Sequence, residues 1–164
     1  MVDIATMGAA VGALLKERGQ TVAVAESSSG GLICAALLAV PGASAYFKGG
    51  GTVYTGAAKQ LLMDLSDVAM SADRAATETH ARHLADAART RLDADWGIGE
   101  TGAAGPSGNR YGDPPGHTCI GVSGPVCRTA TVETGQDERV DNIAACAAAA
   151  LALLKTCVDK AAAA

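Results

Sequence analysis

A short stretch near the amino terminus constrains the fold of this chain more than any other. Thr21 to Ala25 has the β-branched alternation of a short buried strand, and three serines and two glycines follow at Ser27 to Gly31. Leu32 to Val40 then has the composition of a helix that stops at Pro41-Gly42. The stretch therefore predicts a strand, a tight turn and a helix, as in α/β sheets.

The polar turn lies where ligands bind in open α/β sheets, at the carboxyl end of a strand and the amino terminus of a helix. The N–H groups of a helix's first turn favour a phosphate or a developing oxyanion. Gly30 and Gly31 lack Cβ atoms, so a substrate or another backbone can approach them closely. Ser27 to Ser29 are equally typical of residues that simply cap a helix. Both interpretations stay open from this stretch alone.

Length and charge limit the classes of function. A chain of 164 residues is expected to form a single domain over residues 1–164 with a real core. It has 13 basic and 17 acidic residues and no Lys/Arg run, so nucleic acid is not an expected partner. No signal peptide is evident, and the most apolar run, Ile143 to Leu154, is too short to span a bilayer. We expect a cytoplasmic protein without membrane association.

The cysteines and histidines do not predict a metal site or a disulfide framework. Two histidines, His80 and His83, lie three residues apart on a helix predicted from Ser71 or Asp73 to Leu92. This spacing can chelate a metal, but no third ligand is apparent, and a solvated helix face is favoured. The cysteines have no C-x-x-C spacing, and all five are expected to be reduced: Cys34, Cys119, Cys127, Cys146 and Cys157. Cys34 and Cys146 fall among small apolar neighbours and are expected to be packing residues.

The remaining segments alternate between helical and strand-like patterns. The predicted elements are a first helix over Ile4 to Leu15 that ends at Gly19, a strand over Thr52 to Thr55 after three glycines, a helix over Gly56 to Met63, a strand over Trp96 to Gly99, a long Gly/Pro loop from Glu100 to Gly116, a hairpin of His117 to Val122 and Val126 to Val132, and a closing helix over Val140 to Val158. We predict an α/β fold: a single three-layer domain with a mixed, mostly parallel sheet flanked by helices. The narrow, Ala-rich stripe of the closing helix suits tight packing across a subunit interface, so a homo-oligomer is expected.

Three separated segments together resemble the CinA C-terminal domain family. They are Glu26-Ser27-Ser28-Ser29-Gly30-Gly31, which is similar to the family's Glu-Ser-Cys-Thr-Gly-Gly motif; Pro41 to Phe47 followed by Tyr54 and Lys59, which resembles its second block; and Thr101 to Pro106 with Pro115-Gly116, which resembles its third. The order and spacing of the blocks also agree. The similarity extends from the first helix to the last.

This family is known for domains that hydrolyse the amide of nicotinamide mononucleotide, releasing ammonia and leaving nicotinate mononucleotide. The resemblance implies that Ser27 is the nucleophile, that Lys59 activates it and that Tyr54 belongs to the same site. A serine hydroxyl is a weak nucleophile until a base takes its proton. A desolvated lysine whose pKa falls toward neutrality can serve as that base. Such chemistry implies no metal and no cofactor.

The first block is also expected to contact the substrate, a small nucleotide. Its candidate substrate-binding residues are Glu26, Ser29, Gly30 and Gly31, and backbone N–H groups near the two glycines would hold the oxyanion.

The third block supplies a second group of candidate substrate-binding residues. Thr101, Gly102 and Gly105 offer a hydroxyl and backbone donors for ribose or phosphate, although a crossover loop can need glycine for its geometry alone. The phosphate also requires a cation, for which the candidates are Arg139, Arg110 and Lys48.

The chain departs from the family pattern at two places. Tyr54 to Lys59 reads Tyr-Thr-Gly-Ala-Ala-Lys, whereas members commonly have Tyr-Ser-Asn-Glu-Ala-Lys, so an amide and a carboxylate are lost. Asp137 and Asp141 replace expected basic residues and would repel an anion unless Arg139 reaches inward.

These changes leave three functions open: the nucleotide amidohydrolase, a Ser/Lys amidase for another small amide, and a non-catalytic paralogue that binds a nucleotide or a partner protein. Ser44 is a rival nucleophile, but a serine in a Pro-Gly turn is more often a turn former.

Overall fold

The computed structural model describes residues 3–163, which fold into alternating helices and strands. In chain order the elements are α1 (Ile4–Arg18), β1 (Val22–Glu26), α2 (Leu32–Leu38), the 3-10 turn η1 (Ala43–Ala45), β2 (Phe47–Thr52), α3 (Gly56–Met63), α4 (Asp67–Ala72), α5 (Glu78–Arg91), β3 (Trp96–Ala103), β4 (His117–Ser123), β5 (Arg128–Glu133) and α6 (Arg139–Ala163). The ends of the predicted domain, residues 1, 2 and 164, lie outside the described residues.

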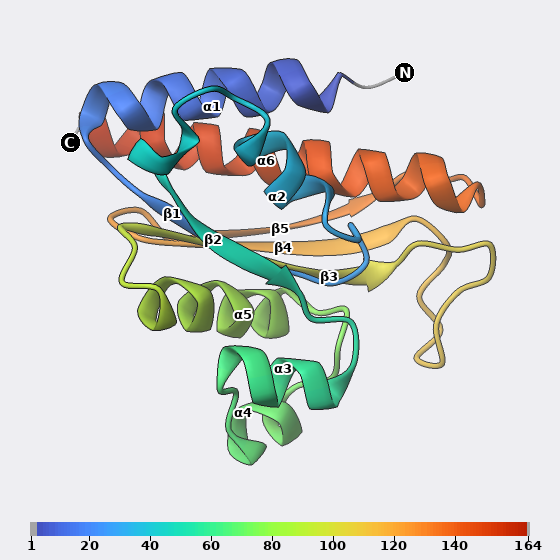
Figure 1. Ribbon diagram of the computed structural model, residues 1–164. Coiled ribbons are helices and arrows are strands. Elements are labelled where there is room, and N and C mark those ends of the chain that lie inside the picture. Colours follow the sequence, from blue (N-terminus) through green and yellow to red (C-terminus); the bar gives the residue numbers. More distant parts are fainter. Residues whose placement is uncertain (1–2, 164) are drawn as a thin grey trace.

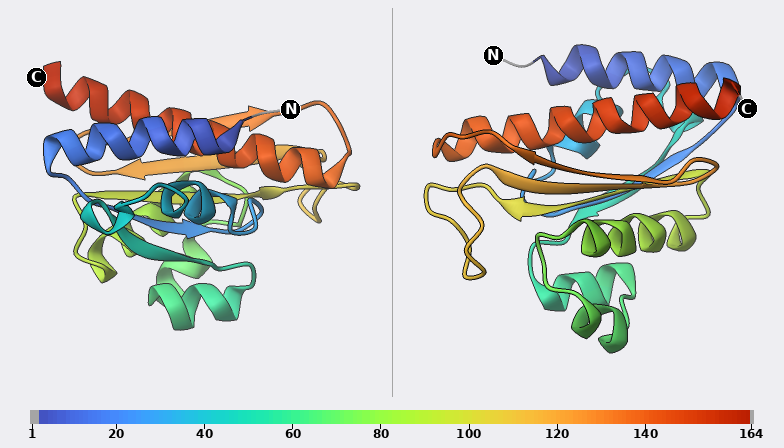
Figure 2. Two further views of the ribbon diagram at one scale, coloured as in Figure 1. Left: turned by 45° about the horizontal axis from the view of Figure 1, so that its top comes forward. Right: turned by 180° about the vertical axis from the view of Figure 1, so that it is seen from behind.

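The strands form one five-stranded sheet in the order β2-β1-β3-β4-β5. β1 is parallel to both β2 and β3, whereas β3 with β4 and β4 with β5 are antiparallel. Figures 1 and 2 show α1, α2 and α6 over one face of the sheet and α3, α4 and α5 over the other. The predicted three-layer α/β fold with a mixed sheet is confirmed, with antiparallel pairs as numerous as parallel ones.

Each face of the sheet has its own apolar core. Under α1, α2 and α6 the core includes Leu15, Trp96 and Leu151, all fully buried. Under α5 and α3 a smaller core includes Ala23, Val53 and Leu84. The side chains are mostly small, so helices and strands approach closely, as the shortage of aromatic residues in the sequence implies.

Two glycines of β3 allow α5 to lie directly on the sheet. A Cβ at Gly97 would lie 2.0 Å from the carbonyl oxygen of Ala85, and one at Gly99 would lie 2.0 Å from that of Ala81. No side chain fits in that space. The pattern Trp96-Gly97-Ile98-Gly99 therefore buries its large residues on the α1 and α6 side and leaves the other side open for helix backbone.

The strand predicted over Thr52 to Thr55 is wrong in its position, because β2 ends at Thr52 and includes the three glycines. The register between β1 and β2 shifts after Val22, which is the irregularity expected of a glycine run. A Cβ at Gly50 would lie 2.8 Å from the Cys34 sulfur of α2. The same Cβ would lie 2.5 Å from the Val24 carbonyl oxygen of β1, so the close approach of both β1 and α2 requires glycine and overrides its low strand propensity.

The helix predicted from Ser71 or Asp73 to Leu92 forms as α5, but its predicted start is wrong. Ser71 and Ala72 end α4, Asp73 is extended, Ala76 has a left-handed φ of 59°, and α5 begins at Glu78. Ser66 caps α4 and Thr77 caps α5, each accepting a backbone N–H through its side chain. These caps fix where α5 starts, and thereby the place of His80 within its first turn.

The closing helix, α6, is longer than the predicted Val140 to Val158. It is the one helix among the described residues that could cross a membrane by length and composition alone. Here it lies along the sheet, where its small residues pack against α1 and β4. Because this stripe is used within the chain, it no longer argues for a subunit interface, and the homo-oligomer stays a prediction.

Candidate functional site

The site lies where the carboxyl ends of β1 and β3 meet the start of α3. A cavity of about 630 Å³ opens there, and its lining includes Ser27, Lys59 and Tyr54. The three side chains predicted to act together come from the turn after β1, from α3 and from the link between β2 and α3. The parallel pairing of β1 with β2 and β3 brings these segments to one edge of the sheet.

The Glu100 carboxylate holds the serine turn in place. Its oxygens accept the backbone N–H groups of Ser27 at 3.0 Å and Ser29 at 2.9 Å. They also accept the hydroxyls of Ser28, Ser29 and Thr118. Glu100 is fully buried, and these donors satisfy its charge in place of water. It fixes the backbone from which the Ser27 side chain projects.

Sequence analysis missed this role of Glu100 and placed the residue at the start of a loop. The available signal was a carboxylate directly after the apolar strand Trp96 to Gly99, since a charge at a buried strand end needs partners. The strand continues to Ala103, which draws Glu100 into the sheet beneath the turn.

Glu26 and Ser29, predicted to bind substrate, are fully buried and have structural partners. The Glu26 carboxylate accepts the backbone N–H groups of Ile33 at 3.0 Å and Cys34 at 2.9 Å, so it satisfies the first turn of α2. The Ser29 hydroxyl bridges Glu26 and Glu100 at 2.8 Å from each. The serine-capping interpretation of this turn is therefore wrong for Ser29, whose hydroxyl donates to carboxylates, and the side chain that accepts the first N–H groups of α2 is Glu26.

Gly30 and Gly31 provide left-handed backbone, with φ of 66° and 100°. The Gly30 N–H donates to the Ser27 carbonyl at 3.2 Å and closes the turn, so in this conformation it points toward the backbone and not toward a substrate oxyanion. Gly31 is the N-cap residue of α2. Both glycines are required by the turn geometry.

Lys59 is buried, with 4% of its surface exposed, and lies on α3. Thr55 begins this helix by accepting the Ala58 N–H at 3.1 Å. Burial lowers the pKa of the Lys59 amine from its usual value, and the Glu100 charge opposes this shift. A lysine with a lowered pKa exchanges protons more readily near neutral pH, which is what a general base requires.

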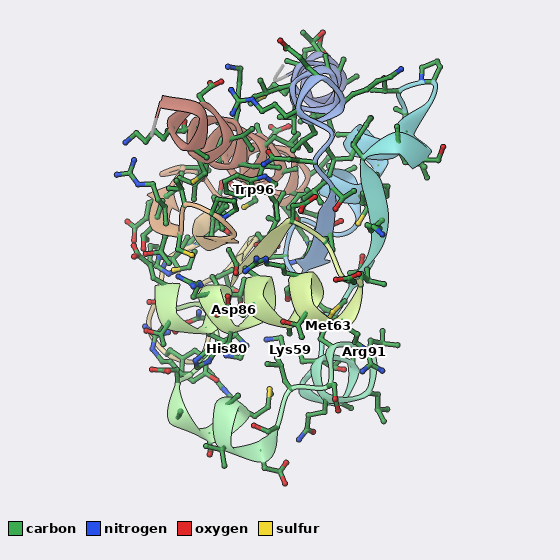
Figure 3. All side chains as sticks on the ribbon, turned by 90° about the vertical axis from the view of Figure 1, so that its left-hand side faces the viewer. Lys59, Met63, His80, Asp86, Arg91 and Trp96 are labelled. Atoms are coloured by element: carbon green, nitrogen blue, oxygen red, sulfur yellow. The ribbon has the colours of Figure 1, made fainter. Side chains whose placement is uncertain are left out.

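His80 contacts Lys59, and this contact was not predicted from the sequence. Its Nε2 lies 3.0 Å from Lys59 Nζ, and only 1% of the residue is exposed. Figure 3 shows both side chains on the side of α5 that faces α3 and α4. The prediction of a solvated helix face is therefore wrong for His80. The packing of α3 over α5, which periodicity within one helix does not show, covers it.

Tyr54 and the third block surround the rest of the opening. Tyr54 is 61% exposed at the rim, where the larger cavity meets a smaller one of about 240 Å³. Gly102 lines both, and Gly105 and Arg139 line the smaller. Arg139 reaches inward, a possibility that the sequence left open, and its Nη1 donates to the Gly105 carbonyl at 2.6 Å.

Thr101 connects the site to the segment before α5. Its Oγ1 accepts the Ala76 N–H at 3.1 Å, and the residue is 2% exposed while lining the larger cavity. Gly102 is required for packing because a Cβ there would lie 2.3 Å from the His117 carbonyl oxygen.

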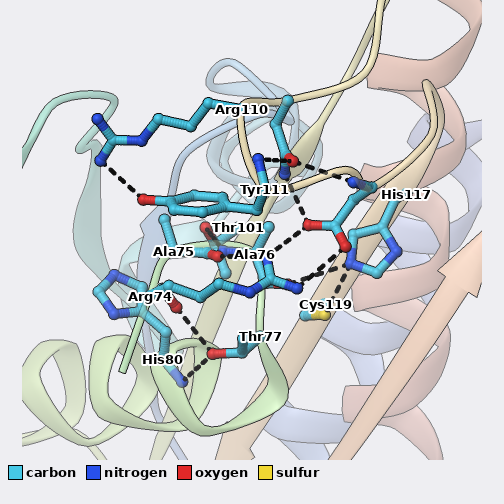
Figure 4. A network of polar contacts seen from close by, with 12 residues as sticks. Arg74, Ala75, Ala76, Thr77, His80, Thr101, Arg110, Tyr111, His117 and Cys119 are labelled. Atoms are coloured by element: carbon cyan, nitrogen blue, oxygen red, sulfur yellow. Dashed lines mark hydrogen bonds and ion pairs between the residues drawn. The ribbon is translucent and has the colours of Figure 1, made fainter. Parts of the chain in front are cut away.

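A network of polar contacts includes two arginines that line the cavity, Arg74 and Arg110 (Figure 4). Arg74 forms an ion pair with Asp113 at 2.6 Å, and hydrogen bonds with Arg74 lower the pKa of Asp113 to about 2. The Arg74 and Arg110 guanidinium groups each lie 4.9 Å from the centre of the Tyr111 ring. Arg110, one of the predicted phosphate-binding cations, lines the cavity with Arg74, whereas Lys48 is exposed on β2 and Ser44 in the η1 turn.

The cysteines do not contribute to the site. All five are free thiols, and burial raises the pKa of Cys146 to about 12 and that of Cys34 still further. Such thiols stay protonated and pack as small apolar groups. Within residues 3–163, no three metal-ligating side chains come together.

Comparison with known sequences connects this geometry to a family. A model of the CinA C-terminal domain matches residues 4–158. A CinA-like protein of Synechococcus sp. (strain CC9902) is 43% identical over 122 residues, which cover 74% of this chain and 29% of that protein. One of Parasynechococcus marenigrum (strain WH8102) is 42% identical over 134 residues, covering 82% and 32%. The chain thus spans about three tenths of the length of these relatives.

Solved structures share the fold over nearly their whole length. A competence-damaged protein (CinA) superfamily protein of Escherichia coli has a TM-score of 0.84 at 28% identity, covering 94% of this chain and 92% of that one. The competence/damage inducible protein of Agrobacterium tumefaciens has a TM-score of 0.87 at 26% identity, covering 95% and 96%. A superfamily protein of Klebsiella pneumoniae, at 24% identity, shares the fold with a TM-score of 0.88 and coverage of 98% and 99%.

Proposed function

Because this chain belongs to the CinA C-terminal domain family, we propose that it is an amidohydrolase that converts nicotinamide mononucleotide to nicotinate mononucleotide and ammonia. One observation carries the proposal: Ser27 and Lys59 line the same cavity although 31 residues separate them in the chain. A nucleophile and a buried amine at one cavity are the minimum set for amide hydrolysis without a metal.

In the proposed reaction, Ser27 Oγ attacks the carboxamide carbon while Lys59 Nζ takes the hydroxyl proton. The resulting ammonium then gives that proton to the departing nitrogen, the C–N bond breaks, and ammonia leaves an ester on Ser27. Water attacks the ester, its proton passes through Lys59 to Ser27 Oγ, and the acid is released. The lowered pKa of Lys59 supports its role as the proton acceptor.

The charges around the cavity support an anionic substrate. Arg74, Arg110 and the acidic Asp73 line the larger cavity, Arg139 lines the smaller one, and Tyr54 lines both. Asp113 neutralises Arg74, so Arg110 and Arg139 are the arginines proposed to meet the phosphate. We propose that the protein acts in the cytoplasm.

The experiment is ammonia release from nicotinamide mononucleotide by the purified wild-type chain, with nucleotide binding measured by calorimetry. Turnover supports the proposal. Binding without ammonia release favours a non-catalytic paralogue, which is the second candidate because Asp137 and Asp141 add negative charge beside Arg139. Ammonia release from other small amides, but not from this nucleotide, identifies a different Ser/Lys amidase.

A further inference from the structure

The contact between Lys59 and His80 places a second nitrogen base at the candidate site. His80 Nε2 lies 3.0 Å from Lys59 Nζ, and His80 lines the same cavity as Ser27. Both side chains are almost entirely buried, so water does not compete freely for this hydrogen bond. The pair joins α5 to α3 across the wall of the cavity.

Burial is the main reason that the pKa of His80 falls, to about 4, and repulsion from Lys59 and His83 in their protonated forms adds to the effect. The carboxylate of Asp73, before α5, raises the pKa of His80 and so opposes this shift. Glu100, on β3, likewise raises the pKa of Lys59. The imidazole is therefore neutral at pH 7, with one N–H group and one free lone pair.

We propose that His80 is a positioning residue for Lys59, in which the lone pair of Nε2 accepts an N–H from the amine and turns the amine's own lone pair toward Ser27. This inference rests on the proposed function. The imidazole carries its proton on Nδ1, which has no hydrogen-bond partner in the described part of the chain. When Lys59 takes the Ser27 proton, the same Nε2 holds the new ammonium.

A neutral acceptor suits this position better than a carboxylate. A second carboxylate beside Lys59 would favour the ammonium and leave no lone pair to take the serine proton. Imidazole orients the amine without adding a negative charge. The opposite tautomer, protonated at Nε2, would donate to the amine and occupy the lone pair that the reaction needs.

The test compares His80→Gln, whose amide can place an acceptor near the position of Nε2, with His80→Asn, whose shorter side chain cannot reach Lys59. For His80→Asn we expect kcat to fall about 10- to 100-fold with KM nearly unchanged. The acid limb of the pH profile should also move to lower pH, because the Lys59 ammonium loses its acceptor. His80→Gln should recover most of kcat.

The matched control is His83→Asn on the same helix, which is expected to keep the wild-type kcat and pH profile. Thermal unfolding of each variant checks that it is folded. A kcat and an acid limb that stay at the wild-type values in His80→Asn overturn the inference. So does a His80→Gln variant that is no better than His80→Asn.

A second readout does not depend on turnover and separates this inference from the proposed function. Nitrogen NMR of the wild-type imidazole is expected to show His80 protonated at Nδ1, with an Nε2 signal that shifts in Lys59→Met. A ring protonated at Nε2, or one unaffected by Lys59→Met, contradicts the inference even if the protein is active. An inactive wild-type protein with the expected signals instead contradicts only the proposed function.

Discussion

Buried charge organises the site at the scale of single residues. Glu100 accepts hydrogen bonds from three serines in the turn after β1 and from Thr118 of β4. Glu26 accepts a backbone N–H group from the first turn of α2. Both carboxylates are fully buried, so each depends on its protein donors. The position of Ser27 is therefore set by buried residues that never meet the substrate.

Glu100→Gln is expected to lower the free energy of unfolding by about 2 kcal/mol or more. The amide NH₂ group would face donors, and at least one buried N–H or hydroxyl would lose its partner. Urea unfolding measures the change. Glu17→Gln, at an exposed position of α1, serves as the control and should stay within about 0.5 kcal/mol of wild type. Equal stability of the two variants would show that the Glu100 contacts contribute little.

Lys59→Met is expected to abolish turnover and to raise the free energy of unfolding at pH 7 by about 1 kcal/mol. The pKa of Lys59 is lowered in the folded protein, so the unfolded chain binds the proton more tightly and wild-type stability rises with pH. The gain from the substitution should shrink as pH approaches the ordinary lysine pKa of about 10.4. Urea titrations at several pH values test this, with the exposed Lys16→Met as control. A gain that grows with pH contradicts the assigned shift.

The sequence predicted some residues of the site and missed others for a physical reason. Ser27, Lys59 and Tyr54 stand in motifs that can be read along the chain, and the structure places them around one cavity. Glu100 and His80 act through partners 72 and 21 residues away, and only the packing of β3 and α3 creates those contacts. A helical spacing of histidines does not reveal which helix covers them.

At the scale of elements, the contact between α5 and β3 determines where His80 lies. The helix rests on Gly97 and Gly99, where a Cβ has no room. Elements whose ends have strong local signals were predicted well, such as α3 with the bounds Gly56–Met63. Elements that depend on a neighbour were predicted less well. The glycine run belongs to β2 because α2 and β1 approach that strand closely, and α5 begins only where Thr77 caps it.

Gly99→Ala is expected to lower the free energy of unfolding by about 1–3 kcal/mol and to reduce activity, because the new methyl group pushes α5 from the sheet. Gly51→Ala is the matched control, since the nearest atom to a Cβ there, Met63 Cε, is 3.8 Å away. Thermal unfolding compares the two. A Gly99→Ala protein as stable as Gly51→Ala would mean that α5 adjusts at no cost.

At the scale of the whole molecule, the cavity is assembled from segments spread over most of the chain. Ser27, Lys59, Gly102 and Arg139 come from four parts of the sequence and meet at one end of the sheet. The three-layer fold was predictable because hydrophobic patterns report buried faces. The volume of the cavity and the direction of Arg139 were not, since they depend on loops whose geometry is set by tertiary contacts.

Arg139→Gln tests whether this assembly recognises a phosphate. KM for nicotinamide mononucleotide is expected to rise about 10-fold or more, because a charged hydrogen bond is lost, while kcat changes little. KM for nicotinamide riboside, which has no phosphate, should not change. The exposed Arg128→Gln on β5 controls for net charge. An equal rise for both substrates would assign Arg139 to holding the Gly105 loop alone.

The most direct test of the account is the rate of ammonia release from nicotinamide mononucleotide by Ser27→Ala, measured beside wild type and the control Ser44→Ala. Ser44 is an exposed serine in the η1 turn, so its loss should leave the rate unchanged. Ser27→Ala should retain its fold, because its backbone N–H still reaches Glu100, and should lose turnover by at least about 10³-fold. Wild-type activity in Ser27→Ala would contradict the assignment of the nucleophile.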